Sequence, residues 1–181
     1  MTHNDVLQFW FTELKPKQWF SKDDALDQLI TDRFGNLYQQ AIRCELYSWR
    51  KSATGRLAEI IVLDQFSRNM FRDQAAAFAH DALAVALTQA AIDVGADQQL
   101  LEQPEKLAFL YMPLMHSESA LIHELAVEKF SQPGLEQNLA FEHRHKAIID
   151  QFGRYPHRNE VLGRISTPQE RQFLTQPGSS F

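Results

Sequence analysis

The chain has 181 residues, of which 44% are hydrophobic and 23% are charged, and its formal net charge is -5. These values are typical of one globular domain with a full core, so we expect a single domain over residues 1–181, with a frayed tail from about residue 176. The negative charge argues against a general binder of nucleic acids or acidic membranes.

Apolar residues recur at helical spacing from the start of the chain. The first predicted helix has Asn4 or Asp5 as its cap and ends before Pro16, and a second opens at Asp23 or Asp24. The apolar stripe of the second helix consists of Leu26, Leu29, Ile30, Phe34, Leu37, Tyr38 and Ile42. Both segments therefore indicate amphipathic helices that bury one face.

The rest of the chain continues as helices separated by short turns. Gly153 fits a left-handed helix cap, and Pro156 fits the first turn of the next helix. Pro113 should kink or end the helix that contains it. Thr167 and Glu170 form the two ends of a predicted capping box. A turn is predicted at 52–55. The further predicted helices cover 56–72, 78–94, 117–130, 135–152 and 157–162, and two more begin at residues 104 and 168.

No segment of useful length alternates between apolar and polar residues, so no strand is predicted. We expect an all-α fold of stacked antiparallel helix pairs. The chain shows no clean self-similarity at a period of about 34 residues, and so the sequence alone does not support a regular repeat array.

The single cysteine, Cys44, cannot form an intramolecular disulfide, so a reducing compartment is predicted. We interpret Cys44 as a packed thiol in a helical stretch. No window offers about 18 uncharged apolar residues for a transmembrane helix. The first residues lack a basic region before an apolar run, which argues against a secretory signal. We therefore expect a cytoplasmic protein with no membrane partner and no nucleic-acid partner.

The segment LDQFSRNMFR has an acid and a base where the apolar stripe of its helix should continue. Asp64 and Arg68 are four residues apart, the favourable order for an ion pair within a helix. Gln65, Asn69 and Arg72 extend the polar strip on the adjoining flank. Two interpretations remain open: a structural ion pair that fixes helix register, or one wall of a polar pocket.

The segment HKAIIDQFGRYPHRNEVLGR gathers histidines and arginines around a helix end, a turn and a short helix. The first N–H groups of that short helix, at residues 157–159, should favour an anion held by Arg154 and Arg158, with Arg72 or Arg164 as further donors. In the alternative interpretation, this is a buried turn whose arginines cap helix ends or pair with acids.

Histidines are the candidate proton carriers if the protein is an enzyme, which the sequence leaves uncertain. The candidates are His116, beside Glu118, and His145 and His157. Each has a structural alternative, as a satisfied core or capping residue. A metal is not expected, because the chain has no HExxH motif and no paired cysteines. No cofactor is expected either, since no glycine-rich nucleotide motif is present.

Several stretches together resemble the bacterial domain-of-unknown-function family 924 (DUF924), over nearly the whole chain. They are VLQFWF, the pair Trp19-Phe20, LDQFSRNMFR, FLYMPLMHSE, HKAIIDQFGRYPHRNEVLGR and STPQERQFL. The resemblance implies a helical fold similar to tetratricopeptide repeats (TPR-like), a right-handed superhelical array without consensus repeats, and no established activity. The family pattern carries over onto Asp64, Gln65, Arg68, Asn69, Arg72, His116, Glu118, His145, Arg154, His157, Arg158, Asn159 and Arg164.

Two positions depart from this pattern. His123 stands where a glutamine is expected after the MHSE segment, and His143 is an additional histidine beside His145.

Two hypotheses about function follow. In the first, the protein binds a small anionic molecule in a pocket shared by Asp64, Arg68, His116, His145, Arg154, His157 and Arg158. In the second, it is a non-catalytic TPR-like scaffold that binds a peptide or protein partner, and the polar motifs fix the geometry between helices.

Overall fold

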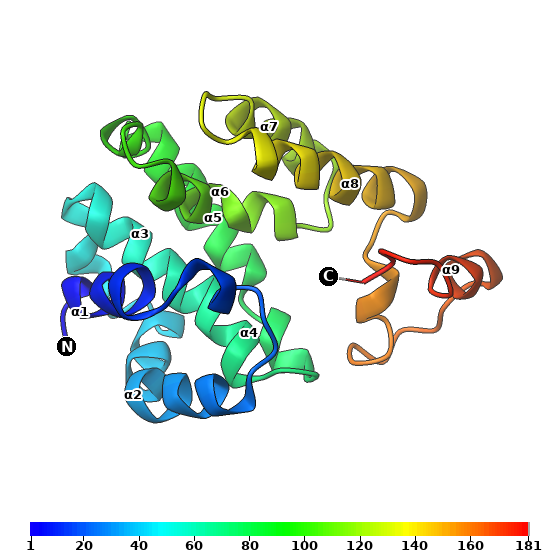
Figure 1. Ribbon diagram of the computed structural model, residues 1–181, viewed down its shortest axis with the longest axis horizontal. Helices are drawn as coiled ribbons and strands as arrows, with labels where there is room; N and C mark the ends of the chain where they lie inside the picture. The colour runs from blue at the N-terminus through cyan, green and yellow to red at the C-terminus, as the bar shows by residue number, and fades with distance from the viewer. Residues whose placement is uncertain (181) are drawn as a thin grey trace. The chain divides into compact units, whose positions relative to one another are not determined.

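A computed structural model describes residues 1–180, which form helices and turns and contain no β-strand (Figure 1). The all-α class is therefore confirmed, whereas the superhelical array of helix pairs stays a prediction. The α-helices are α1 (His3–Gln8), α2 (Asp24–Ile42), α3 (Ala53–Ile61), α4 (Ser67–Met70), α5 (Asp81–Asp93), α6 (Pro104–His116), α7 (Ala120–Phe130), α8 (Glu136–Phe152) and α9 (Pro168–Phe173). Two five-residue π-helical turns cover Phe9–Glu13 and Val62–Phe66, and short 3-10 turns cover Pro16–Gln18, Tyr47–Lys51, Ala75–Phe78, Gln98–Leu100 and Pro156–Arg158.

The chain divides into two compact units, and each is described by itself. The N-terminal unit contains Met1–Arg72 and Ala76–Pro113. The C-terminal unit contains Asp73–Ala75 and the chain from Leu114 onward. A single domain over the whole chain stays a prediction.

The middle of the central helix of the N-terminal unit is buried on all sides. This helix consists of α3, the π turn Val62–Phe66 and α4, and every residue from 57 to 67 is buried. The π turn was not predicted, and it changes the faces on which later side chains lie. The helix also begins at Ala53, because Ser52 accepts a hydrogen bond from the N–H of Gly55 at 3.0 Å and so caps it.

Helices α2 and α1 of this unit also have side-chain hydrogen bonds at their first turns. Asp23 accepts hydrogen bonds from the N–H groups of Ala25 and Leu26, at 3.0 and 3.2 Å, which confirms it as the cap of α2. For α1 the predicted caps are wrong, because Thr2 is the N-cap and Asp5 accepts from its N–H at 2.6 Å.

Aromatic rings fill the centre of the N-terminal unit. The centroid of the Phe34 ring lies 4.7 Å from that of Phe66 and 4.9 Å from that of Phe9. Trp10 packs edge-on against Phe109 of α6 at 5.5 Å. All five rings are buried, so this cluster joins α2, α6 and the two π turns into one core.

In the C-terminal unit, α7 and α8 lie side by side (Figure 1). Gly153 ends α8 with a φ of 69°, as predicted for a left-handed cap. The predicted helix at 157–162 is instead the 3-10 turn Pro156–Arg158. Helix α9 opens with the predicted capping box, in which the Thr167 side chain accepts from the N–H of Glu170. A small core of Ile148, Ile149, Tyr155, Phe152 and Phe173 joins these segments.

The structure decides two sequence predictions about single residues. Pro113 does not end its helix, because α6 continues to His116, whereas a kink at Pro113 stays a prediction. Cys44 is exposed rather than packed, and it has a positive φ of 57° in the turn after α2.

One described segment, Ala75–Asp93, is long and apolar enough to cross a membrane by length and composition. Core helices of soluble proteins pass the same test. The continuous helix α5 has only 13 residues, which span about 20 Å, less than the roughly 30 Å of a hydrocarbon core. Its inner face contributes Ala84, Leu87 and Ala91 to the protein core.

Candidate functional site

Tyr155 is the centre of the polar residues in the C-terminal unit. It follows the reversal at Gly153 that ends α8, and its side chain is fully buried. Its hydroxyl donates to the carbonyl of Met115 at 2.5 Å, and its N–H donates to Glu118 Oε1 at 2.7 Å. Tyr155 is therefore held both by its hydroxyl and by its backbone.

Four charged or titratable side chains surround this ring. The centroids of the His123, His145 and His157 rings lie 6.2, 5.9 and 5.6 Å from that of Tyr155. The guanidinium carbon of Arg158 lies 4.5 Å from the same centroid, within cation-π range. Residues from α7, α8 and the 3-10 turn are thus brought together, and we call them the histidine site.

Two of these histidines are held neutral. His145 Nδ1 lies 2.8 Å from the carbonyl oxygen of Phe141, which can only accept, so Nδ1 carries the proton and Nε2 a lone pair. Burial lowers the pKa of His145 to about 3. Burial and the neighbouring Arg158 lower the pKa of His157 to about 4. Near neutral pH both rings can therefore donate one hydrogen bond and accept another.

His123 belongs to a pair that sequence reasoning missed. Its Nδ1 lies 2.6 Å from Glu142 Oε1, and its Nε2 lies 2.8 Å from the carbonyl oxygen of Ser117. Burial raises the pKa of Glu142, whereas His123 acts in the opposite direction. The pair thus holds a proton between two buried groups.

Helical spacing could have revealed this pair. His123 shares the buried face of α7 with Ala126 and Phe130. Glu142 shares the buried face of α8 with His145 and Ile149. Both polar residues take positions at which the spacing predicts an apolar side chain.

An arginine and a glutamate hold the turn that carries the site. Arg164 donates to Glu118 Oε2 at 2.6 Å and Oε1 at 2.9 Å, to Asn159 Oδ1 at 2.9 Å and to the carbonyl of Tyr155 at 3.1 Å. Burial opposes ionisation of Glu118, but the bonds from Arg164 and Tyr155 outweigh it and lower the pKa of Glu118. This network fixes the backbone on either side of His157 and Arg158.

Arg154 is paired with a carboxylate of α9. It donates to Glu170 Oε1 at 2.6 Å and Oε2 at 2.9 Å. The bond from Arg154 is the main cause that lowers the pKa of Glu170 to about 2. The pair lines a pocket of about 490 Å³ together with Gln151, Phe152, Thr167 and Gln169. Arg154 therefore connects α8 with α9, and its charge is already matched.

The predicted anion site in this turn needs a correction. The N–H groups of Arg158 and Asn159 donate to the carbonyls of Tyr155 and Pro156, at 3.1 and 3.0 Å. A 3-10 turn closes its hydrogen bonds one residue earlier than an α-helix, so these donors are already used. The prediction of unpaired N–H groups is wrong for these two residues.

The polar strip of the central helix belongs to the N-terminal unit. Arg68 Nη1 lies 3.1 Å from Asp64 Oδ1, and Arg68 Nη2 lies 3.0 Å from Asp81 Oδ2. Gln65 Nε2 donates to Asp64 Oδ2 at 2.5 Å. Asp64 is only 1% exposed, which confirms the predicted ion pair and its burial.

Asn69 and Arg72 share one carboxylate that the sequence analysis did not single out. Asn69 Nδ2 donates to Asp27 Oδ1 at 2.8 Å, and Arg72 donates to both oxygens, at 2.6 and 2.8 Å. Asp27 lies in the first turn of α2, so the three residues tie α2 to the central helix.

The predicted site residues therefore fall into two sets. His116, Glu118 and the residues from His145 to Arg164 lie in the C-terminal unit, and Asp64 to Arg72 lie in the N-terminal unit. A positive charge on His116 would lower the pKa of both His145 and His157. Convergence of the two sets in one pocket stays a prediction. No group of three or more metal-ligating side chains is found among residues 1–180.

Comparisons with known proteins agree on one relationship. The sequence pattern of the family described as "Bacterial protein of unknown function (DUF924)" matches residues 6–178. A solved structure of a protein of unknown function from Agrobacterium tumefaciens is 37% identical, with a TM-score of 0.89 over 95% of this chain and 96% of that chain. A comparison with curated proteins gives no match.

Proposed function

This chain belongs to the bacterial DUF924 family, and from that premise we propose that it binds a small anionic molecule at the histidine site, as a soluble cytoplasmic protein. One observation carries the proposal. The neutral rings of His145 and His157 and the guanidinium of Arg158 are gathered around the single buried ring of Tyr155. The neutral ring of His157 can donate one hydrogen bond to an anion beside the Arg158 guanidinium, and Nε2 of His145 can accept one from a protonated group of the ligand.

The rigidity of the turn supports this proposal. Glu118, Arg164 and Asn159 bind one another and the backbone of Tyr155. A ligand that meets groups already held in place loses less conformational entropy on binding. In this account the arginine–carboxylate pairs position the site, and Arg158 and the histidines contact the ligand.

The local charge favours an anion. The charges that act on His157 come from Arg158, Arg164, His116 and Glu118, of which only that of Glu118 is negative. The field near the ring is therefore positive, although the whole chain carries -5. In the competing account, a carboxylate of this chain matches that charge, and no exogenous ligand is needed.

Thermal unfolding separates these accounts. The probes are inorganic phosphate, glycerol phosphate and citrate at millimolar concentrations. We expect at least one to raise Tm, since a ligand at 100 times its Kd adds about 2.7 kcal/mol of stability. Arg158→Gln and His157→Gln should abolish the shift, whereas Arg154→Gln should retain it because Arg154 already binds Glu170. An unchanged shift in Arg158→Gln, or no shift with any probe, would contradict the proposal.

A scaffold that binds a peptide or protein is the second candidate. The helix pair of α7 and α8 carries two large exposed apolar side chains, Leu121 at 72% and Phe141 at 53%. Such side chains favour contact with a partner when they lie together. Phe141→Ser should weaken partner binding and leave the anion-dependent Tm shift unchanged. His157→Gln should abolish that Tm shift and leave partner binding unchanged.

A further inference from the structure

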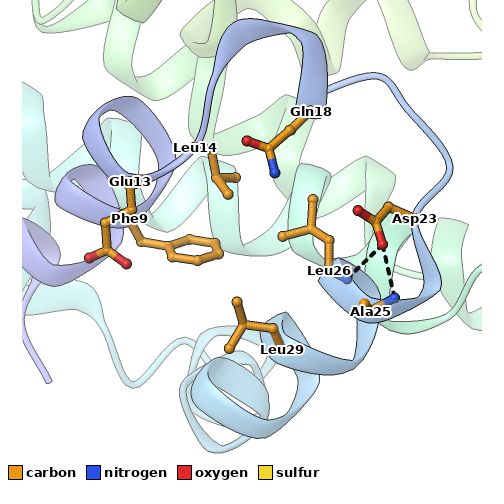
Figure 2. Close-up of a pocket in the computed structure, with 8 residues that line it drawn as sticks. All are labelled: Phe9, Glu13, Leu14, Gln18, Asp23, Ala25, Leu26 and Leu29. Carbon is orange, nitrogen blue, oxygen red and sulfur yellow. Dashed lines mark hydrogen bonds between the residues drawn. The ribbon is translucent and has the colours of Figure 1, made fainter.

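A second pocket lies in the N-terminal unit, and none of its residues belongs to the histidine site. It has a volume of about 380 Å³ and lies between the π turn of Phe9–Glu13 and the start of α2 (Figure 2). Its lining consists of Phe9, Glu13, Leu14, Gln18, Asp23, Ala25, Leu26 and Leu29. This volume is within the range of about 300–1,000 Å³ typical of small-molecule sites.

The floor of this pocket is apolar. Phe9, Leu14 and Leu26 are buried, and Figure 2 shows their side chains directed toward the centre of the pocket. Leu29 is 48% exposed, although it continues the apolar stripe of α2. An aliphatic group placed here would cover Leu29 and contact the other three side chains.

Two polar side chains stand together at the rim. Asp23 Oδ1 caps α2, and Gln18 Oε1 accepts from the N–H of Lys15 at 2.9 Å. Their remaining atoms, Asp23 Oδ2 and Gln18 Nε2, make no hydrogen bond with any described residue, and both side chains lie on the same side of the pocket (Figure 2). The rim therefore offers one negatively charged acceptor and one donor.

The other carboxylate of the lining is already matched. Glu13 accepts from Arg33 at 2.6 and 3.1 Å, and this bond lowers the pKa of Glu13. Asp23 is thus the acidic group that remains for a ligand.

We propose that this pocket binds an aliphatic amino-acyl group with a free ammonium, as at the N-terminus of a peptide. The ammonium donates to Asp23 Oδ2, and the adjacent carbonyl accepts from Gln18 Nε2. The side chain lies against Phe9, Leu14, Leu26 and Leu29. A free amino acid fits less well, because its carboxylate would lie close to that of Asp23.

L-Leucinamide tests the proposal as a minimal probe, by chemical-shift titration of the ¹⁵N-labelled full chain. We expect saturable shifts at the pocket residues with a millimolar Kd. N-acetyl-L-leucinamide lacks the ammonium, and L-leucine carries the extra carboxylate, so both should bind at least tenfold more weakly. Equal binding of the acetylated probe, or no saturable shift with L-leucinamide at 20 mM, would overturn the proposal.

Variants of residues at the rim and floor of the pocket provide a second test of the proposal. Asp23→Asn removes the charge but retains the helix cap, because asparagine caps helices as well as aspartate. It should weaken L-leucinamide binding at least tenfold, and Leu29→Ser should weaken it several-fold. Asp24→Asn is the matched control, since Asp24 is the next carboxylate and does not line the pocket. Unchanged binding in Asp23→Asn, with native circular dichroism, would also overturn the proposal.

Discussion

His123 Nδ1 lies 2.6 Å from Glu142 Oε1, and neither side chain has any exposed surface. Glu142 Oε2 has no hydrogen-bond partner among the described residues. Two buried ionisable groups are thus paired by one short contact between α7 and α8. The pair also contacts Tyr155, whose hydroxyl lies 3.2 Å from His123 Nε2. The contact connects the helix pair with the histidine site.

Glu142→Ala should destabilise the protein by about 3–5 kcal/mol, because it leaves one member of a buried ionisable pair without its partner. Glu124→Ala is the control, since Glu124 is an exposed acid on α7. Urea unfolding at pH 7 measures both. If the two variants unfold within about 1 kcal/mol of each other, the pair is not a buried contact of this kind.

Stability should fall as the pH is lowered from about 7, partly because of His145. Its pKa in the folded protein is about 3, below the value of 6.5 for a free histidine, so the stability that it contributes is complete above pH 6.5 and is lost as the pH falls toward 3. Between pH 7 and pH 5 this loss is about 2 kcal/mol. Urea unfolding at pH 7 and at pH 5 should show a smaller loss of stability for His145→Gln than for wild type. His143→Gln, at an exposed position on the same helix, should behave as wild type; the same loss in His145→Gln would contradict the assignment.

Asp64 and Arg68 should be energetically coupled. Asp64→Ala leaves a half-buried guanidinium with one carboxylate fewer, and we expect a cost of about 3–5 kcal/mol. The double-mutant cycle with Arg68→Ala should give a coupling of about 0.5–3 kcal/mol. If the two single-variant changes in unfolding free energy add strictly in the double variant, the 3.1 Å contact contributes nothing to stability.

Two helical glycines should respond to alanine with opposite signs. A Cβ at Gly55 would lie 2.1 Å from the carbonyl oxygen of Trp49, so Gly55→Ala forces the backbone apart and should cost at least about 1–3 kcal/mol. A Cβ at Gly35, in α2, meets nothing within 4 Å, so Gly35→Ala should stabilise by about 0.5–1 kcal/mol. Thermal unfolding of the two variants measures the contrast. A stabilised Gly55→Ala would contradict the close approach of the two chain segments.

Features that depend on neighbouring residues could be predicted from the sequence. The cap at Asp23, the left-handed Gly153 and the capping box of Thr167 and Glu170 each require only a few consecutive residues. The Asp64–Arg68 pair is similarly local, because it spans one helical turn. These signals were sufficient for the all-α class, for the starts of α2, α6 and α9 and for the end of α8.

Features that depend on distant partners could not be predicted. Arg72 is 45 residues from Asp27, and Arg164 is 46 residues from Glu118, so nothing in their surroundings in the sequence identifies these carboxylates. The same arginines were predicted to hold an exogenous anion. The π turn Val62–Phe66 was missed for another reason, since no sequence pattern distinguishes it from a regular buried helix.

The most direct test of anion binding at the histidine site is a histidine-selective ¹H–¹⁵N spectrum recorded during titration with inorganic phosphate, glycerol phosphate and citrate. We expect saturable changes in the ring nitrogens of His157 and His145 with at least one probe, because a bound anion favours the protonated ring. The exposed His143 should not change. Ring nitrogens of His145 and His157 that stay unchanged with all three probes at 10 mM, or that shift no more than those of His143, would contradict the proposal.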